Sequence, residues 1–358
     1  MIKKLRAYDL FAGIGGFRAG AMEYSTSMFE FVGYCEMDKY SKLNYDGMFG
    51  SQKENYIANI HTVTRKYSGI DDPWNSYNKD TNQYISDHIP AHDILFAGFP
   101  CQPHSLMGNR RGLYDTRGEL FFDIAAVIRS IKPKYFILEN VRSIRSVNDG
   151  QLMKQIEHVL EKELGYNVSY LLLDSKNYGV PQTRRRIYMV GTADLDQKIG
   201  IPQTVEAKDR KYLTTWHLLE REVEDKYYLS ERILKTILKS VHKGYSRPAE
   251  INKLVARPLT KTMHKMHRAS QDNYYSDPFI KGEYDEDSGV VSLNPNATSR
   301  IRRITPREAF RIQGFSEDLT NKALSVGLSD TRYYMHTGNA VSPNAVAKVL
   351  DELLKGKV

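Results

Sequence analysis

Residues 9–16 of the 358-residue chain read DLFAGIGG, and this stretch decides the fold. It follows a strand predicted over residues 5–10 and precedes a helix expected to begin near Phe17. A glycine-rich turn from a strand into a helix is where open α/β sheets bind nucleotides, because glycine lets the main chain approach a ligand closely. Position 18 is Arg18 rather than a third glycine, and no Lys-Ser/Thr pair follows, so the dinucleotide fingerprint and the phosphate-binding loop are both excluded.

Glu36 supports a nucleotide ligand at this turn. It ends the second predicted strand, 20 residues after Gly16, where a carboxylate can accept hydrogen bonds from both ribose hydroxyls. The two features together predict an adenosine-containing cofactor. They leave open one alternative, a tight strand-to-helix turn with a glutamate on the surface.

Short β-branched or aromatic runs alternate with amphipathic stretches through the first half of the chain, which is the pattern of a parallel sheet with crossover helices. Strands are predicted over residues 5–10, 31–36, 93–97, 135–139, 168–173 and 186–190. Helices are expected to begin near residues 17, 39, 119 and 151, at Pro306 with Thr305 as N-cap, and over residues 342–354. We therefore predict an α/β fold with a doubly wound, mainly parallel, Rossmann-like sheet.

Composition restricts the class of protein. Apolar residues make up 41% and charged residues 26%, close to the globular average, which excludes collagen-like, disordered and disulfide-scaffold chains. Apolar runs such as residues 94–97 fall far short of the roughly 18 residues of a spanning helix, and residues 1–6 lead into a strand without a signal-peptide region. We expect a cytoplasmic protein with no membrane segment. Two cysteines are too few for a four-thiolate zinc site, and we expect no metal.

The character of the chain changes near Asp194, where the regular alternation fades. We predict a first domain over residues 1–193, a second, smaller and irregular domain over 194–299, and a return segment over 300–358 that completes the first domain. The net charge of +8 is mild, but residues 232–268 contain ten basic residues and one acidic residue. This stretch is either a solvated basic face or a contact surface for a polyanion, and only a functional site elsewhere can decide.

Further segments place reactive groups at the carboxyl edge of the predicted sheet. Cys101 lies on a proline-flanked loop after strand 93–97, where nearby arginines would favour the thiolate, whereas Cys35 in an apolar strand is expected in the core. Glu139 ends strand 135–139, where partial desolvation favours the protonated form that can donate a proton. Alternation places Arg184 and Arg186 on one face, where they could hold a phosphate or a pyrimidine carbonyl; plain surface charge is the alternative.

Seven motifs in this order resemble those of the cytosine-C5 DNA methyltransferases. They are DLFAGIGG at 9–16, GFPCQP at 98–103, RGELFFD at 117–123, ENV at 139–141, YGVPQTRRR at 178–186, ITPREAFRIQGF at 304–315 and GNAV at 338–341. The resemblance covers about residues 5–193 and 300–353. It leaves 194–299 unaligned, where that family carries its target recognition domain.

The resemblance implies the fold of the S-adenosylmethionine-dependent methyltransferases and an enzyme that flips a cytosine out of double-stranded DNA and methylates its C5 atom. The nucleophile it implies is Cys101, with Glu139 at N3 of the base and Arg184 and Arg186 supporting the base and the thiol. The residues it implies for S-adenosylmethionine are Phe11, Ala12, Gly13, Gly15, Gly16, Glu36, Met37, Asn59, Ile60, Pro100, Leu120, Asn339 and Ala340. The DNA-binding residues are Gln102 and, from the densest basic run, Lys261, Lys265 and Arg268.

Three positions depart from the family pattern. Met37 stands where an aromatic residue usually stacks on adenine, Asn59 where an aspartate is usual, and His104 where a phenylalanine is usual. A thioether can still cover an adenine face, and Asn59 still offers an acceptor to the adenine amino group. The resemblance also implies a monomer in a restriction-modification system, with no direct contact to a cognate endonuclease.

The sequence leaves one alternative function open and argues against two others. An RNA cytosine methyltransferase on the same catalytic domain would need the same chemistry, and the basic, tyrosine-containing region 194–299 favours DNA without excluding RNA. A catalytically silent binding protein should have lost Cys101 or Glu139, and both are present. A nicotinamide oxidoreductase is excluded by the missing third glycine and by the PCQ and ENV motifs, which that chemistry does not use.

Overall fold

The computed structural model describes residues 4–66, 78–99, 119–210, 212–238, 241–242, 245–246 and 248–357. The chain forms two compact units. Unit 1 comprises Met1–Leu173, Arg185–Gln203 and Ala345–Val358, and unit 2 comprises Asp174–Arg184 and Thr204–Asn344. This division differs from the predicted boundaries at two places, because residues 174–184 and most of the predicted return segment, up to Asn344, pack with unit 2.

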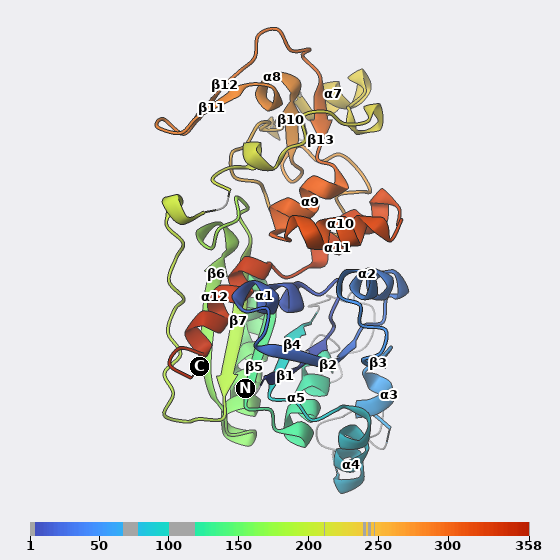
Figure 1. Ribbon diagram of the computed structural model, residues 1–358, viewed down its shortest axis with the longest axis vertical. Coiled ribbons are helices and arrows are strands. Elements are labelled where there is room, and N and C mark those ends of the chain that lie inside the picture. The colour runs from blue at the N-terminus through green and yellow to red at the C-terminus, as the bar shows by residue number, and fades with distance from the viewer. Residues whose placement is uncertain are drawn as a thin grey trace. The chain divides into compact units, whose positions relative to one another are not determined.

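Unit 1 is built on a seven-stranded sheet with the order β3-β2-β1-β4-β5-β7-β6 (Figure 1). Neighbours from β3 to β5 pair in parallel, and β7 pairs antiparallel with β5. All six predicted strands are present; β3 was missed because three residues are too few to show a periodicity. The strands are β1 (Leu5–Leu10), β2 (Phe29–Cys35), β3 (Asn55–Ile57), β4 (Ile94–Gly98), β5 (Tyr135–Val141), β6 (Asn167–Asp174) and β7 (Arg185–Thr192).

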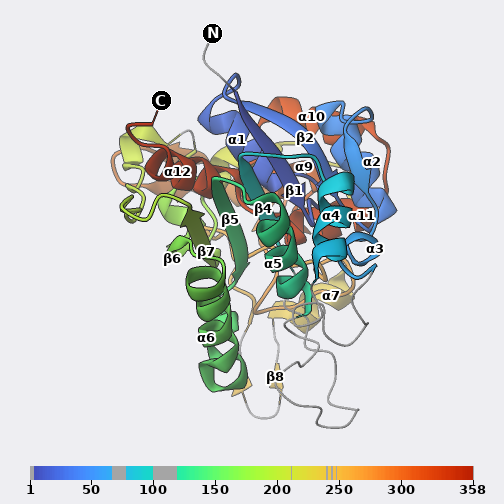
Figure 2. The same ribbon diagram turned by 90° about the horizontal axis from the view of Figure 1, so that it is seen from below.

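Helices cover both faces of this sheet, which confirms the doubly wound α/β prediction. Alternate strand residues such as Leu95 and Leu138 pack in one core with α5, which lies beside β4 and β5 (Figure 2), while Phe96 on the other face stacks on Phe17 of α1 at 5.3 Å. The helices with residues in unit 1 are α1 (Gly16–Tyr24), α2 (Lys39–Phe49), α3 (His61–Thr64), α4 (Lys79–His88), α5 (Glu119–Ile131), η1 (Arg142–Gly150), α6 (Gln151–Glu157), η2 (His158–Glu163) and α12 (Pro343–Leu353).

Unit 2 consists of short elements joined by irregular segments, as predicted for the region after Asp194. Its strands are β8 (Val241–His242), β9 (Tyr245–Ser246), β10 (Tyr274–Ser276), β11 (Glu283–Asp285), β12 (Val290–Ser292) and β13 (Ile301–Arg303). Its helices are η3 (Ser175–Asn177), η4 (Ala207–Asp209), η5 (Thr215–Leu218), η6 (Asp225–Tyr227), α7 (Glu231–Leu238), α8 (Asp277–Ile280), α9 (Pro306–Gln313), α10 (Glu317–Ser325) and α11 (Asp330–Asn339).

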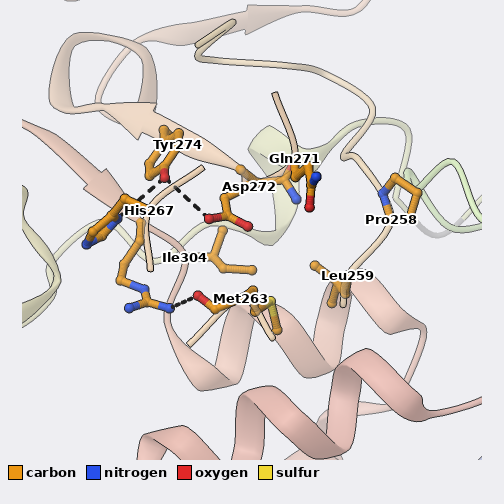
Figure 3. Close-up of a pocket in the computed structure, with 10 residues that line it drawn as sticks. Pro258, Leu259, Met263, His267, Gln271, Asp272, Tyr274 and Ile304 are labelled. Carbon is orange, nitrogen blue, oxygen red and sulfur yellow. Dashed lines mark hydrogen bonds between the residues drawn. The ribbon is translucent and has the colours of Figure 1, made fainter. Parts of the chain in front are cut away.

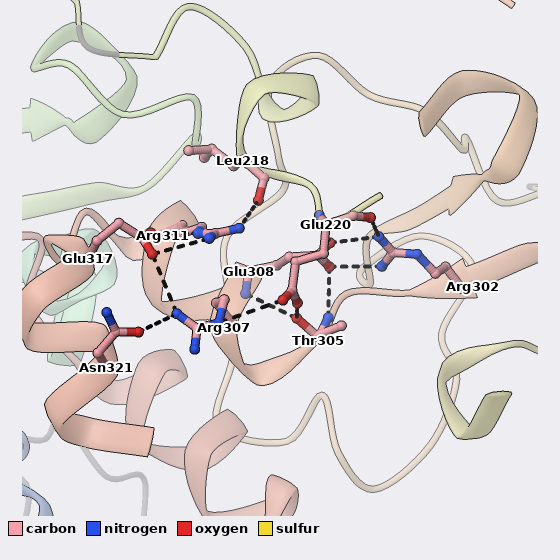
Figure 4. A network of polar contacts seen from close by, with 9 residues as sticks. All are labelled: Leu218, Glu220, Arg302, Thr305, Arg307, Glu308, Arg311, Glu317 and Asn321. Carbon is pink, nitrogen blue, oxygen red and sulfur yellow. Dashed lines mark hydrogen bonds and ion pairs between the residues drawn. The ribbon is translucent and has the colours of Figure 1, made fainter. Parts of the chain in front are cut away.

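Helix α9 is anchored by a buried polar network (Figure 4). Thr305 caps it as predicted, in a capping box that it shares with Glu308, and Pro306 is its first residue. The carboxylate of Glu308 also accepts both terminal nitrogens of Arg302, at 2.6 and 2.8 Å, and both side chains are buried. A bidentate buried pair of this kind costs several kcal/mol to break on one side, so the start of α9 is firmly fixed.

Candidate active site

The turn between β1 and α1 has a main-chain conformation that favours glycine. Phe11, Gly13 and Gly15 all have left-handed backbone conformations, with φ of 55°, 56° and 80°. A Cβ atom on Gly15 would lie 2.3 Å from the ring of Phe49, so packing against α2 excludes any larger residue there. Ala12 and Gly16 are buried beside these positions.

Glu36 ties this turn to the end of β2. Its carboxylate accepts the N–H groups of Gly13 at 2.8 Å and Asp38 at 2.7 Å. Burial raises the pKa of Glu36, and the two N–H donors partly oppose that rise. The same carboxylate keeps lone pairs for further donors, since two oxygens offer about four acceptor sites.

Asp9, the last acidic residue of β1 before the turn, is fully buried, and neither carboxylate oxygen has a hydrogen-bond partner among the described residues. Burial raises its pKa well above the ordinary value, and the nearby charge of Arg18 opposes the rise. A buried carboxylate without donors is costly, so this one calls for a donor that the described part of the chain does not supply. The ammonium group of a bound ligand, or an ordered water molecule between ligand and carboxylate, would supply that donor.

The other residues predicted for the cofactor differ in their surroundings. Met37 is 76% exposed directly after Glu36, so its thioether is available to cover a planar group. Asn59 uses its side-chain oxygen to accept the N–H of His61 at 3.0 Å, which occupies part of the acceptor capacity predicted for adenine. Ile60 is buried in the core, and Leu120 packs partly buried against the same core.

Glu139 and Arg186 meet at the carboxyl edge of the sheet. They lie on the neighbouring strands β5 and β7, and the Nε of Arg186 is 3.0 Å from a carboxylate oxygen of Glu139. Both side chains are largely buried, with 10% of Glu139 and 19% of Arg186 exposed. The arginine therefore holds the carboxylate in a fixed orientation.

Asn140 links this edge to the segment that carries the predicted nucleophile. Its side-chain nitrogen donates to the main-chain oxygen of Phe99 at 2.9 Å, and the side chain is buried. Phe99 is the last described residue before the loop, and Pro100, Cys101 and Gln102 lie outside the described residues. The structure therefore fixes where the chain leaves β4 toward Cys101, on the strand next to Glu139.

Cys35 is a core residue, as predicted. It is 2% exposed, and burial raises the pKa of its thiol to about 12. A thiol with that pKa carries almost no thiolate at neutral pH, so Cys35 is unsuited to nucleophilic attack.

Arg184 is held by main-chain oxygens of unit 2. The guanidinium is 2% exposed within unit 2, where it donates to the main-chain oxygens of Leu259 at 3.1 Å, Gly338 at 3.2 Å and Ala340 at 2.8 Å. The sequence placed Arg184 on one face with Arg186, but Arg184 precedes β7 and the described contacts of the two side chains are separate. Asn339, between two of these carbonyl groups, is exposed.

The basic stretch proves to be partly neutralised. Arg268, predicted to contact DNA, pairs with Asp272 at 2.9 Å and donates to the hydroxyls of Thr260 and Thr262. Lys261 and Lys265 are exposed and make no ion pair among the described residues. Two cations on one loop thus remain available for an anionic partner.

Comparison with known proteins identifies the family. A model of the family described as C-5 cytosine-specific DNA methylase matches residues 5–355. The chain belongs to this family. Similar curated proteins include the Type II methyltransferase M1.ScrFI of Lactococcus lactis subsp. cremoris, 32% identical over 98% of this chain and 78% of that protein. Another is the Type II methyltransferase M.HpaII of Haemophilus parainfluenzae, 31% identical over 98% of this chain and 90% of that protein.

Solved structures show the same fold. The S. pombe Dnmt2 methyltransferase superposes with a TM-score of 0.71 at 18% identity, covering 98% of this chain and 99% of that one. The Entamoeba histolytica methyltransferase EhMeth superposes with a TM-score of 0.67 at 18% identity, covering 99% of each chain. The C-5 cytosine methylase fold prediction is therefore confirmed.

Sequence reasoning missed two polar residues at the carboxyl edge of the sheet in unit 1. Asp9 and Asn140 are buried, and each lies inside a motif that was recognised only for its neighbours. A buried polar side chain in a strand that otherwise reads apolar was the available signal. Within the described ranges no cluster of residues could hold a metal ion, and no helix is long and apolar enough to cross a membrane.

Proposed function

We propose that this C-5 cytosine methylase transfers a methyl group from S-adenosylmethionine to C5 of cytosine in double-stranded DNA, with Cys101 as the nucleophile. The observation that carries the proposal is the Glu139–Arg186 pair at the sheet edge. It stands next to the strand that leads to Cys101, and Asn140 holds the end of that strand. An oriented, largely buried carboxylate beside a nucleophile loop is what addition to a pyrimidine ring requires.

The cofactor residues of unit 1 fit S-adenosylmethionine. Glu36 offers acceptor sites to two ribose hydroxyls, and Met37 offers an exposed thioether to a planar base. The donorless carboxylate of Asp9 suits the ammonium group of the methionine moiety, directly or through water. S-adenosylmethionine would supply an electrophilic methyl group.

The side chains of unit 1 would then carry the reaction on the base. The Cys101 thiolate forms a bond to C6, which moves electron density to C5 while Glu139 neutralises the charge that develops at N3. Arg186 keeps the carboxylate in position during this step. After C5 has gained the methyl group, its proton passes to a water molecule, the C–H electron pair restores the C5–C6 double bond, and Cys101 leaves C6 as a thiolate. A cytosine inside a duplex is out of reach, so the base must first be flipped out.

Unit 2 would contact the DNA backbone through the basic loop (residues 260–268). Replacing both Lys261 and Lys265 by alanine should weaken binding to every duplex and lower the slope of log Kd against log salt by about 1 for each lost phosphate contact, up to about 2 in all. Fluorescence anisotropy across a salt series measures this. The double variant of Lys226 and Lys281, whose ammonium groups are already paired with carboxylates, is the control. Identical slopes for wild type and loop variant would remove the loop from the interface.

Bisulfite sequencing of DNA and of RNA from cells that express the chain tests the function itself. We expect complete protection of one cytosine within one short sequence, as for a methylase of a Type II restriction-modification system. Protection that is confined to RNA, or none above that of cells expressing a Cys101→Ser variant, would refute the proposal.

A further inference from the structure

Gln182 and Arg184 form a buried polar pair on an extended segment of unit 2. Residues 181–183 run alongside Ala256, which donates its N–H to Pro181 at 2.8 Å and accepts the N–H of Thr183 at 2.9 Å. Two residues apart on an extended chain, Gln182 and Arg184 point to the same side. Gln182 is fully buried and Arg184 is 2% exposed.

Both main-chain polar groups of Leu259 are held by this pair. The N–H of Leu259 donates to the side-chain oxygen of Gln182 at 3.1 Å, and its carbonyl oxygen accepts from Arg184 at 3.1 Å. A residue whose donor and acceptor are both fixed cannot rotate about its main chain without losing a buried hydrogen bond. The position and direction of the chain are therefore set where it enters the basic loop at Thr260.

Side-chain hydrogen bonds also join the two ends of the basic loop. Arg268 at its end donates to the hydroxyls of Thr260 at 2.9 Å and Thr262 at 3.1 Å, and pairs with Asp272. The pocket behind the loop measures about 20 Å³, room for one water molecule, and is closed by residues such as Met263 and Ile304 (Figure 3). A base cannot enter that pocket, so the exposed side chains of the loop, among them Lys261 and Lys265, are the groups available to a partner.

Other hydrogen bonds connect Arg184 and its neighbours to the end of α11 and the end of α9. Arg184 also binds the carbonyl oxygens of Gly338 and Ala340, and Gln313 donates to Ala340 at 2.7 Å. A Cβ on Gly338 would lie 2.2 Å from the main chain of Thr260, so the entry to the loop rests directly on the end of α11. The start of the loop, the end of α9 and the end of α11 are therefore held together by these contacts.

We propose that Gln182 and Arg184 are positioning residues that set the register of the basic loop on DNA and thereby the preference for the target sequence. The proposal rests on DNA binding by this loop and goes beyond it. A planar guanidinium reaches three carbonyl oxygens in fixed directions, which a lysine ammonium cannot reproduce. The loop should therefore shift when either residue is replaced, while its lysines keep their charge.

Gln182→Met and Arg184→Lys test this, with Arg311→Lys as a matched control. Arg311 also donates to a main-chain oxygen in unit 2, that of Leu218, and it pairs with Glu317, so its described polar partners are not residues of the loop (Figure 4). The probes are a duplex with the site found by bisulfite sequencing and a scrambled duplex of equal length. Anisotropy gives both Kd values, and tritiated-methyl incorporation gives kcat at saturating DNA.

For Gln182→Met we expect the ratio of the two Kd values to fall at least tenfold, with the scrambled duplex bound within threefold of wild type and kcat within threefold. For Arg184→Lys the loss of preference should exceed the loss of kcat. An unchanged Kd ratio in folded Gln182→Met overturns the proposal. So does a fall in kcat beyond 100-fold with intact preference in Arg184→Lys, the result expected if Arg184 supports the base or the thiol.

Three further results have a defined meaning. If Arg184→Lys fails to fold, as judged by circular dichroism, Gln182→Met alone decides. If bisulfite sequencing finds no protected site, the proposed function itself has failed. If a site is found but wild-type protein binds both duplexes equally, the loop sets no preference and the proposal for Gln182 and Arg184 is overturned.

Discussion

Replacing Glu36 by alanine perturbs the residue that joins the glycine turn to β2. The carboxylate accepts the N–H groups of Gly13 and Asp38 at 2.8 and 2.7 Å. Asp38 is exposed, so its N–H regains a hydrogen bond from water, and the main loss falls on the ligand. A charge-assisted hydrogen bond is worth about 1.5–3 kcal/mol, which corresponds to a roughly 10–150-fold weaker Kd for S-adenosylmethionine.

Isothermal titration of the purified variants with S-adenosylmethionine measures this loss. Glu30→Ala is the matched control, because Glu30 is an exposed glutamate at the other end of the same strand. The pKa of Glu36 is raised, so the ionised form that accepts ribose hydroxyls should disappear at a higher pH than for an ordinary glutamate. Wild-type affinity should therefore fall as the pH is lowered through that raised pKa, and the Glu36→Ala affinity should not. Equal Kd values for Glu36→Ala and Glu30→Ala would show that Glu36 does not bind the cofactor.

Three other predictions address chemistry and stability. Cys101→Ser should abolish methyl transfer and leave cofactor affinity unchanged by calorimetry, because an alcohol supplies too little anion at neutral pH, whereas Cys35→Ala should retain most activity. Arg186→Lys should lower kcat by about 10–150-fold in tritiated-methyl assays, since Glu139 loses its oriented partner; unchanged kcat would contradict this. Burial lowers the pKa of His92 to about 4, below its value in the unfolded chain. The free energy of unfolding should therefore fall by about 3 kcal/mol as the pH is lowered from 6.5 to 4. Denaturant unfolding of His92→Phe should lack that loss.

The sequence predicted the sheet well because unit 1 obeys local rules. Leu95 and Leu138 alternate with residues of the opposite face, and Thr305 and Pro306 mark the start of α9, so period and capping suffice there. The Glu139–Arg186 pair was also within reach, since both stand at strand ends that meet at one edge. The division of the chain into units was not, because it depends on contacts between residues far apart in the sequence.

The partners of Arg184 and Arg268 could not be predicted from the sequence. Arg184 was predicted to support the base and the thiol, and Arg268 to contact DNA. The described partners of Arg184 are main-chain oxygens, and those of Arg268 are Asp272 and two threonines, none of which the sequence indicated. A guanidinium looks the same in a sequence whether it faces a phosphate or three carbonyl groups. Only tertiary structure supplies the difference, because the partners of Arg184 lie 75 to 156 residues away.

Covalent capture of the protein on DNA tests directly whether Cys101 is the nucleophile. A duplex with 5-fluorocytosine at the target position has no C5 proton to lose after methyl transfer, so the Cys101–C6 bond should persist. Wild-type protein with S-adenosylmethionine should give a band of protein joined to DNA on a denaturing gel, and Cys101→Ser should give none. No adduct with wild type, or an equal adduct with Cys101→Ser, would contradict the account.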